Sequence, residues 1–199
     1  MNIVFDIGNV LIAWEPERAF ARHFSDPAAA RAYLAEIDFF TWNVELDRGR
    51  SFLEGLAAAA AAYPGCTAPL EGYLAGFPQT IRQPIAGTWA LLDQLQAQGL
   101  PLFAITNFAA ETWPHALDLH PRLGSVFRDV VVSGHERLVK PDPAIYRLLL
   151  SRNGLAAEDC FFIDDSANNV AGARAIGMAA HHFTTPTALE DDLLRRGLL

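Results

Sequence analysis

MNIVFDIGNVLI, residues 1–12, begins with a short run of β-branched and aromatic residues and then stops at a single carboxylate, Asp6. Residues 2–5 are too few for a helix, and Asp6 and Gly8 bound the run, so we predict a buried strand. Similar apolar runs recur later in the chain, at residues 102–106, 130–133, 160–163 and, more weakly, 179–183. These five runs are the predicted strands of one sheet.

Helical patterns lie between the later strands, at residues 88–98, 142–153 and 166–176. Each has a capping residue near its start and a glycine just past its end, as helix termini favour. Strands that alternate with helices form βαβ units, whose right-handed crossovers give a parallel sheet. The predicted fold class is therefore α/β, with a Rossmann-like, doubly wound parallel sheet as its core.

The segment 15–84 interrupts this alternation. It is rich in Ala, Leu and aromatic residues, contains no convincing strand, and is broken at Asp26-Pro27, Arg48-Gly49 and Pro64-Gly65. We therefore predict an inserted small helical cap over residues 15–84. The α/β core is then built from residues 1–14 and 85–199.

Composition and charge limit the classes of partner. With 199 residues, 51% of them hydrophobic and 19% charged, the chain can bury a full core and is expected to be soluble and globular. Its formal net charge of -8 argues against a nucleic-acid surface, which needs clustered Lys and Arg. No apolar run reaches the roughly 20 residues of a membrane span and no cationic leader precedes the first strand, so we expect a cytoplasmic protein without a membrane partner. The oligomeric state is left open.

Polar residues directly follow the predicted strands: Asp6, Thr106 with Asn107, Ser133, and Asp164 with Asp165. In open parallel sheets, ligands bind outside the carboxyl ends of the strands, so these side chains are expected at one site. Lys140 is the only lysine of the chain, which suggests a site that needs a compact ammonium group. A nucleophilic carboxylate, a hard-cation site, an ammonium and a hydroxyl together favour phosphoryl transfer.

Four motifs, FDIGNVLI, ITN, VKPDPAIY and FIDDSANNVAGA, occur in this order along the chain. They resemble the four motifs of the haloacid dehalogenase-like (HAD) hydrolase superfamily and span the core from end to end. The Asp-x-Gly-Asn-Val start resembles that of a subgroup of sugar-phosphate phosphatases with a small helical cap. The resemblance implies a hydrolase, and specifically a phosphatase of small phosphorylated metabolites such as sugar phosphates, with Mg²⁺ as its cofactor.

The resemblance also implies a nucleophile and a metal site. Asp6 would attack the substrate phosphorus and form an aspartyl-phosphate, which water then hydrolyses. Mg²⁺ would be held by the Asp6 carboxylate, the Gly8 backbone carbonyl and the Asp165 carboxylate. Asp164 and Asn169 would surround the metal without necessarily coordinating it, or would reach its waters.

The remaining catalytic groups implied by the resemblance bind the transferring phosphoryl group. Thr106 and the backbone N–H of Asn107 would donate hydrogen bonds to it. Lys140 would pair both with that group and with the nucleophile Asp6.

The chain departs from the superfamily at Gly8. Most phosphatases of this superfamily carry a second aspartate there, which protonates the leaving oxygen and later activates water. A glycine keeps the carbonyl ligand for the metal and loses the acid. Glu15, Asp47 and His115 are candidates to supply the missing acid, and the sequence does not rank them.

Two alternative functions stay open. In the dehalogenase branch, the aspartate attacks carbon without a metal, but that branch has no use for the Asp164-Asp165 pair. A non-catalytic phospho-ligand-binding protein on the same fold would explain a missing acid, although drift would not spare the nucleophile, the hydroxyl, the lysine and the metal ligand together. A receiver-like signalling domain shares the ingredients, but its acidic pair adjoins the first strand and no long cap interrupts its sheet.

Residues near the cap junction and after the second motif are expected to line a substrate pocket over Asp6. The cap carries an aromatic cluster in Phe39-Phe40-Thr41-Trp42-Asn43, and helical spacing puts some of these side chains on one face. The expected pocket residues are Trp14, Phe40, Trp42, Asp47, Arg48 and Phe108. A cap that closes over the nucleophile would exclude water and limit substrates to small phosphate esters.

Overall fold

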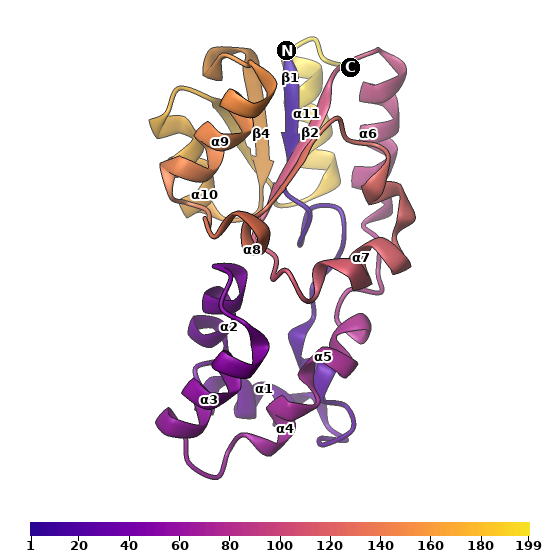
Figure 1. Cartoon of the computed structure of the whole chain (residues 1–199). Helices are drawn as coiled ribbons and strands as arrows, with labels where there is room; N and C mark the ends of the chain where they lie inside the picture. Colours follow the sequence, from indigo (N-terminus) through magenta and orange to yellow (C-terminus); the bar gives the residue numbers. More distant parts are fainter.

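The computed structural model describes all 199 residues and contains one parallel sheet of five strands. The strands are β1 (Asn2–Phe5), β2 (Leu102–Thr106), β3 (Val130–Val132), β4 (Cys160–Asp164) and β5 (Ala179–His182). Their order across the sheet is β3-β2-β1-β4-β5, so the strand that opens the chain lies in the middle (Figure 1). The predicted α/β class with a Rossmann-like parallel core is confirmed.

The register places the ends of the central strands side by side. Phe5 of β1 pairs with Ala104 of β2 and with Ile163 of β4. The backbone N–H of Asp6 then donates to the carbonyl of Ile163 over 2.8 Å. The residues that immediately follow β1 and β4 are therefore neighbours, as parallel strands require of their carboxyl ends.

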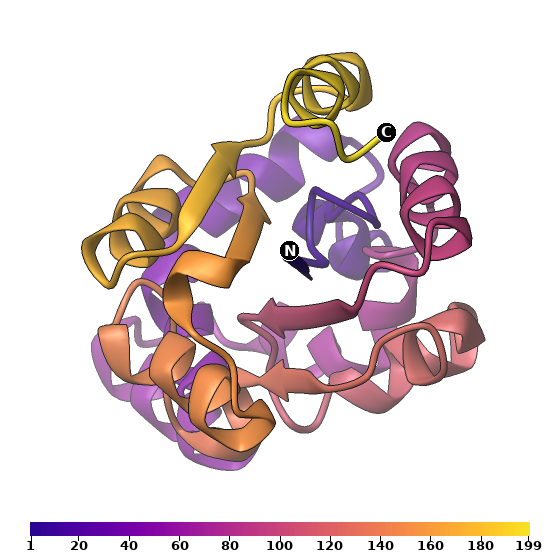
Figure 2. The same ribbon diagram turned by 90° about the horizontal axis from the view of Figure 1, so that it is seen from above.

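Helices cover both faces of the sheet, as Figure 2 shows from above. Alternate β1 residues point to opposite faces, because a strand has a side-chain period of two. Ile3 packs in the core that includes α6 (Ala86–Ala97) and α11 (Pro186–Arg195). Val4 packs in a separate core with α9 (Pro143–Asn153) and α10 (Ala167–Ala175).

Shorter helices fill the connections between the core strands. They are α7 (Trp113–Leu119), η3 (Pro121–Gly124), α8 (Ser133–Glu136) and η4 (Ala157–Asp159). Ser133, expected at the end of the third strand, begins α8 instead. None of the helices in the chain combines the length and apolar character that a bilayer span requires.

The residues between β1 and α6 form a cluster of helices beyond the carboxyl ends of the strands (Figure 1). These are η1 (Pro16–Phe20), α1 (Pro27–Glu36), α2 (Phe39–Asp47), α3 (Phe52–Ala62), α4 (Ala68–Glu71), α5 (Tyr73–Gly76) and η2 (Phe77–Gln79). The predicted breaks coincide with helix ends: Asp26 caps α1 through its carboxylate, and Gly49 and Gly65 have positive φ after α2 and α3.

Two connecting segments of the chain join these helices to the sheet, and the two segments are hydrogen-bonded to one another. The N–H of Ala13 donates to the carbonyl of Gln83, and the N–H of Ile85 donates to the carbonyl of Leu11, over 2.9 and 2.8 Å. The chain therefore leaves and re-enters the core at one place. The division into a core of residues 1–14 and 85–199 and a cap of residues 15–84 stays a prediction that this paired connection supports.

Candidate active site

Asp6 lies at the carboxyl end of the central strand, where only 6% of its surface is exposed. Its Oδ1 accepts a hydrogen bond from the N–H of Ile7 over 2.7 Å and lies 2.8 Å from Nζ of Lys140. Burial raises the pKa of Asp6, and the neighbouring Asp164 raises it further, while Lys140 opposes both effects. The carboxylate is thus aimed and partly neutralised by the ammonium beside it.

Lys140 joins two carboxylates from different strands. Its Nζ lies 2.8 Å from Asp6 and 2.7 Å from Oδ2 of Asp164, and its side chain is fully buried. Burial lowers the pKa of Lys140, but the two carboxylates outweigh that effect and raise it. The buried ammonium is therefore held in its charged form.

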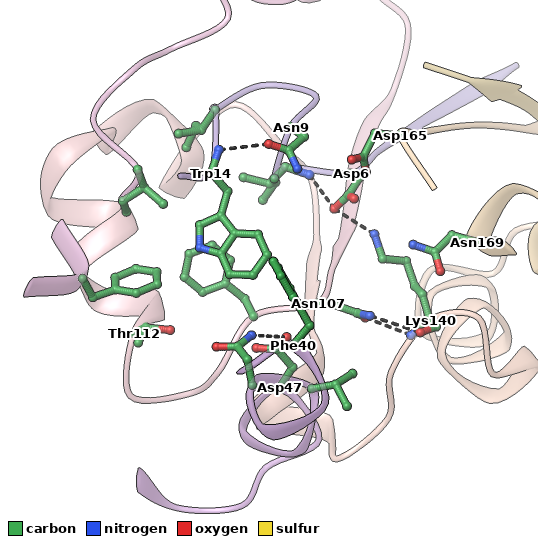
Figure 3. Close-up of a pocket in the computed structure, with 18 of the residues that line it drawn as sticks. Asp6, Asn9, Trp14, Phe40, Asp47, Asn107, Thr112, Lys140, Asp165 and Asn169 are labelled. Atoms are coloured by element: carbon green, nitrogen blue, oxygen red, sulfur yellow. Dashed lines mark hydrogen bonds and ion pairs between the residues drawn. The ribbon is translucent and has the colours of Figure 1, made fainter. Parts of the chain in front are cut away.

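Asn107 fixes the backbone that carries this lysine. The N–H of Lys140 donates to Oδ1 of Asn107 over 2.8 Å, and Nδ2 of Asn107 donates back to the Lys140 carbonyl over 3.1 Å. Figure 3 marks these two hydrogen bonds, which join the loop after β2 to the loop before α9. The sequence reasoning assigned only the Asn107 backbone a role, and it missed this positioning role of the side chain.

Three carboxylates gather at this edge of the sheet. Oxygens of Asp6, Asp164 and Asp165 all lie within 4.8 Å of one another. Asp164 is already occupied, because it accepts hydrogen bonds from the N–H of Ser166 and from Nδ2 of Asn169 as well as from the lysine. Burial and the Asp164 charge raise the pKa of Asp165.

The donor set fits a hard divalent cation. Three carboxylates gather near a single ammonium, which pairs with two of them, so the cluster carries excess negative charge. Burial, and then the neighbouring carboxylates, raise the pKa values of Asp6 and Asp165. Carboxylate and carbonyl oxygens are the ligands that Mg²⁺ prefers. Asp6, whose Oδ1 is already engaged by Ile7 and Lys140, Asp165 and the Gly8 carbonyl are the groups beside the cavity that could hold one.

The Thr106 hydroxyl is the second unusual group. Thr106 ends β2, is 1% exposed, and its Oγ1 has no hydrogen-bond partner within the chain. Buried hydroxyls rarely stay unpaired, so each such case calls for an explanation. An anionic oxygen bound between Thr106 and Asp6 would satisfy this donor, although Thr106 itself is not among the residues that line the adjoining cavity.

A cavity of about 280 Å³ lies between the sheet edge and the helical cap. Its sheet side carries the polar groups described above, together with Gly8 and Asn169 (Figure 3). Its cap side is mainly aromatic and apolar: the lining residues there include Trp14, Phe40, Val44, Tyr73 and Phe77, with Phe108 from the core loop after β2. Lys140 is the only basic side chain in the lining.

Four of the six expected pocket residues line this cavity: Trp14, Phe40, Asp47 and Phe108. Trp42 does not, and this expectation is corrected. Its Nε1 donates to the carbonyl of Gly55 over 2.8 Å, and its ring packs against Phe52 of α3 and Tyr73 of α5.

Arg48 is the second correction. Its Nε lies 3.5 Å from Glu45 on the cap surface, and it does not line the cavity. α2 ends at Asp47, and the chain turns away at Gly49. The residue after the helix therefore faces solvent while the last helical residue faces the cavity.

Neither the backbone conformation nor a lack of space requires a glycine at position 8. Its φ is not positive, and a Cβ atom placed on it would meet nothing within 4 Å. The strained position is the next one, because Asn9 has a φ of 53° and its Oδ1 accepts the N–H of Trp14. The missing side chain at Gly8 therefore leaves open space beside Asp6.

Sequence reasoning missed a polar pair on the cap. Nδ2 of Asn43 donates to Oδ2 of Asp47 over 3.1 Å, and the Tyr73 hydroxyl donates to Oδ1 of Asn43 over 3.0 Å. All three residues line the cavity. The spacing of four residues between Asn43 and Asp47 is the signal that could have paired them.

Comparisons with known proteins agree with this geometry. The family model described as haloacid dehalogenase-like hydrolase matches residues 1–177. The chain is 28% identical over 188 residues to the sesquiterpene phosphatase astK of Aspergillus oryzae, covering 93% of this chain and 90% of that protein. A predicted HAD-like family hydrolase of known structure from Porphyromonas gingivalis is 27% identical with a TM-score of 0.73, covering 98% of this chain and 97% of that one.

A more distant structure shares the fold alone. It is a HAD family enzyme from Bacteroides thetaiotaomicron, solved in complex with magnesium and inorganic phosphate. It is 18% identical with a TM-score of 0.70, covering 92% of this chain and 94% of that one.

Proposed function

The chain belongs to the haloacid dehalogenase-like hydrolase family, and from this premise we propose that it is a magnesium-dependent phosphatase of small phosphate esters. The observation that carries the proposal is the joint placement of Asp6, Lys140 and Asp165 beside one cavity. A buried nucleophile, a fixed ammonium and an acidic pair are what transfer of a phosphoryl group to a carboxylate needs. The relative named a sesquiterpene phosphatase adds support.

The metal would be held by the carboxylates of Asp6 and Asp165 and by the carbonyl of Gly8. When bound, Mg²⁺ stabilises negative charge on the transferring phosphoryl oxygens. Asp164 would not be a direct ligand, because its oxygens are engaged by Lys140, Ser166 and Asn169. It holds the lysine in place instead.

The protein side chains would divide the reaction into two steps. An oxygen of Asp6 attacks phosphorus, and the alcohol leaves with the electron pair of the broken P–O bond. Water then attacks the aspartyl-phosphate and returns the electron pair to Asp6. Lys140 holds its charge beside both the nucleophile and the phosphoryl group, and the unpaired Thr106 hydroxyl donates to a phosphoryl oxygen.

The dehalogenase alternative is less well supported. A metal-independent attack on carbon gives no role to the carboxylate cluster that includes Asp165. We therefore keep dehalogenation as the outcome that the experiment below must exclude.

The cavity favours an alcohol with an apolar part over the sugar phosphate that the first motif suggests. Phe40 is 60% exposed on α2, yet it lines the cavity and packs edge-on against Trp14. Exposed aromatic side chains at the mouth of a cavity are typical of sites that bind apolar ligands. The relative named a sesquiterpene phosphatase is consistent with this class.

Phosphate release is the direct test. Purified protein is assayed with p-nitrophenyl phosphate, a hexose phosphate, an alkyl phosphate and a prenyl phosphate, with Mg²⁺ and with excess EDTA. We expect phosphate release that EDTA abolishes, with the apolar esters as the better substrates. Full activity in EDTA, or release of halide from 2-chloropropionate, would contradict the proposal.

A further inference from the structure

We propose that the cap residue Asp47 replaces the acid missing at Gly8: it donates a proton to the leaving alcohol and then accepts one from the attacking water. This inference rests on the phosphatase function proposed above. It assigns both proton transfers to the cap rather than to the sheet.

The structure separates the three candidate acids. Glu15 forms an ion pair with Arg18 over 2.7 Å and lines a different hollow, on the outside of the cap. His115 packs against the ring of Phe77 and does not line the active-site cavity. Asp47 lines the same cavity as Asp6.

Asp47 faces the nucleophile from the opposite wall. Figure 3 shows it on α2, on the cap side of the cavity, with Asp6 and Lys140 on the sheet side. A leaving oxygen departs on the side of the phosphorus opposite to the nucleophile, because attack and departure are roughly in line. A carboxyl group on the cap wall is therefore on the side where the proton is needed.

The side chain of Asp47 is held in one orientation. It is 9% exposed, and its Oδ2 accepts a hydrogen bond from Asn43, which in turn accepts one from the buried Tyr73 hydroxyl. This chain of hydrogen bonds from α5 through α2 fixes one carboxyl oxygen. The backbone of Ala109, in the core loop after β2, also interacts with this carboxyl group.

The protonation state suits an acid that must later act as a base. Burial raises the pKa of Asp47 to about 7, against the opposing effects of Lys140, the Ala109 backbone and Asn43. The charged or titratable groups that share the cavity with it are Asp6, Lys140 and Asp165 from the core and Tyr73 from α5. Burial keeps the pKa of Tyr73 well above its usual value. Near neutral pH both forms of Asp47 are populated, which favours proton transfer in either direction.

The proton balance closes over the two steps. In the first, the bond from phosphorus to the alcohol oxygen breaks, and the Asp47 proton moves to that oxygen to give a neutral alcohol. In the second, Asp47 as a carboxylate takes a proton from water as the water oxygen bonds to phosphorus and Asp6 leaves. Phosphate is released, and Asp47 is protonated again.

Two substrates with different leaving groups test the first step. p-Nitrophenolate is a stable anion and leaves without a proton, whereas the alkoxide of hexyl phosphate needs one. We expect Asp47→Asn to lower kcat/KM for hexyl phosphate by about 10²- to 10⁴-fold. The kcat/KM for p-nitrophenyl phosphate, which reports on attack by Asp6, should change by less than about threefold.

Glu45→Gln is the matched control, because it makes the same carboxylate-to-amide change on the same helix. Glu45 pairs with Arg50 at 3.0 Å on the surface and does not line the cavity. We expect it to leave both kcat/KM values unchanged. Asp47→Glu keeps a carboxylic acid and should restore part of the hexyl phosphate activity.

A pH profile separates a proton donor from a structural residue. With the wild type, kcat/KM for hexyl phosphate should fall as pH rises above about 7, because Asp47 loses its proton there. The Asp47→Asn variant should lack this descending limb. A melting temperature within a few degrees of the wild type shows that the variant is folded.

The outcomes that overturn the inference are distinct from failure of the proposed function. Equal losses for both substrates in Asp47→Asn, no loss for hexyl phosphate, or an unchanged descending limb would each reject Asp47 as the acid. Wild-type protein that releases no phosphate from either ester with Mg²⁺ would reject the phosphatase function and this role with it.

Discussion

The two walls of the active-site cavity are built in different ways. On the sheet side, the charged groups belong to one buried network, in which Lys140 bridges Asp6 and Asp164 at 2.8 and 2.7 Å. On the cap side, aromatic rings dominate, and one carboxyl group, Asp47, is held by neutral partners. In the mechanism that we propose, the sheet performs the chemistry at phosphorus, while the cap selects the alcohol and handles its proton.

The largest expected effect concerns the sheet wall alone. Asp165→Ala removes a proposed metal ligand and should lower kcat/KM by about 10²- to 10³-fold or more. This corresponds to a loss of about 3 to 4 kcal/mol of transition-state stabilisation. The residual rate should no longer depend on Mg²⁺. The measurement is kcat/KM across a Mg²⁺ titration for the variant and the wild type.

Asp191→Ala is a suitable control, because Asp191 is an exposed aspartate of α11 that does not line the cavity. It should leave the Mg²⁺ titration unchanged. A wild-type Mg²⁺ response in Asp165→Ala would show that the cation binds elsewhere and that the carboxylate cluster is not its site.

A smaller effect tests whether the acid can be moved from one wall to the other. A side chain at Gly8 has space, since a Cβ there meets nothing within 4 Å. Adding Gly8→Asp to the Asp47→Asn variant should therefore restore hexyl phosphate hydrolysis by about 10- to 100-fold, part of what general acid catalysis is worth. The kcat/KM for hexyl phosphate, compared with the Asp47→Asn variant alone, measures it.

Restoration must be specific for the ester that needs a proton. If Gly8→Asp raised hydrolysis of p-nitrophenyl phosphate by the same factor, the gain would come from something other than proton donation. No gain with either ester, in a folded double variant that still binds Mg²⁺, would mean that the cap acid has no equivalent on the sheet.

The smallest effect concerns the apolar part of the cap wall. Phe40→Ala removes an exposed ring at the cavity mouth and should raise KM for prenyl or alkyl esters up to about tenfold, as expected for loss of roughly one kcal/mol of apolar contact. kcat should stay nearly constant, because the ring is expected to contact the alcohol part of the substrate and not the phosphoryl group. An unchanged KM for apolar esters would argue that the cavity does not select its alcohol there.

The sheet wall could largely be predicted from the sequence for a physical reason. Asp6, Thr106 and Asp164-Asp165 each follow an apolar run, and parallel topology brings the carboxyl ends of strands to one edge. Each residue is recognisable from its own strand, and the parallel fold then brings these residues together. The role of the Asn107 side chain escaped because it depends on where the Lys140 backbone passes in space.

The cap wall was predictable only in part. Phe40 and Trp42 are close together on one helix, and the sequence predicted both at the pocket. Packing against α3 buries Trp42 inside the cap and leaves Phe40 facing the cavity. Arg48 does not reach the cavity, because the chain turns away at Gly49. Three candidate acids were equivalent in sequence, and the structure distinguishes them because only Asp47 reaches the cavity.

The central claim is that Asp6 carries the phosphoryl group during turnover, and acid-quenched protein tests it most directly. Wild-type protein mixed with Mg²⁺ and p-nitrophenyl phosphate is quenched during turnover, digested, and its peptides are mapped by mass spectrometry. The account predicts a phosphoryl adduct on the peptide that contains Asp6 and its absence in Asp6→Asn, which should also lose turnover. Phosphate release with no adduct on Asp6, or with the adduct on another residue, would contradict it.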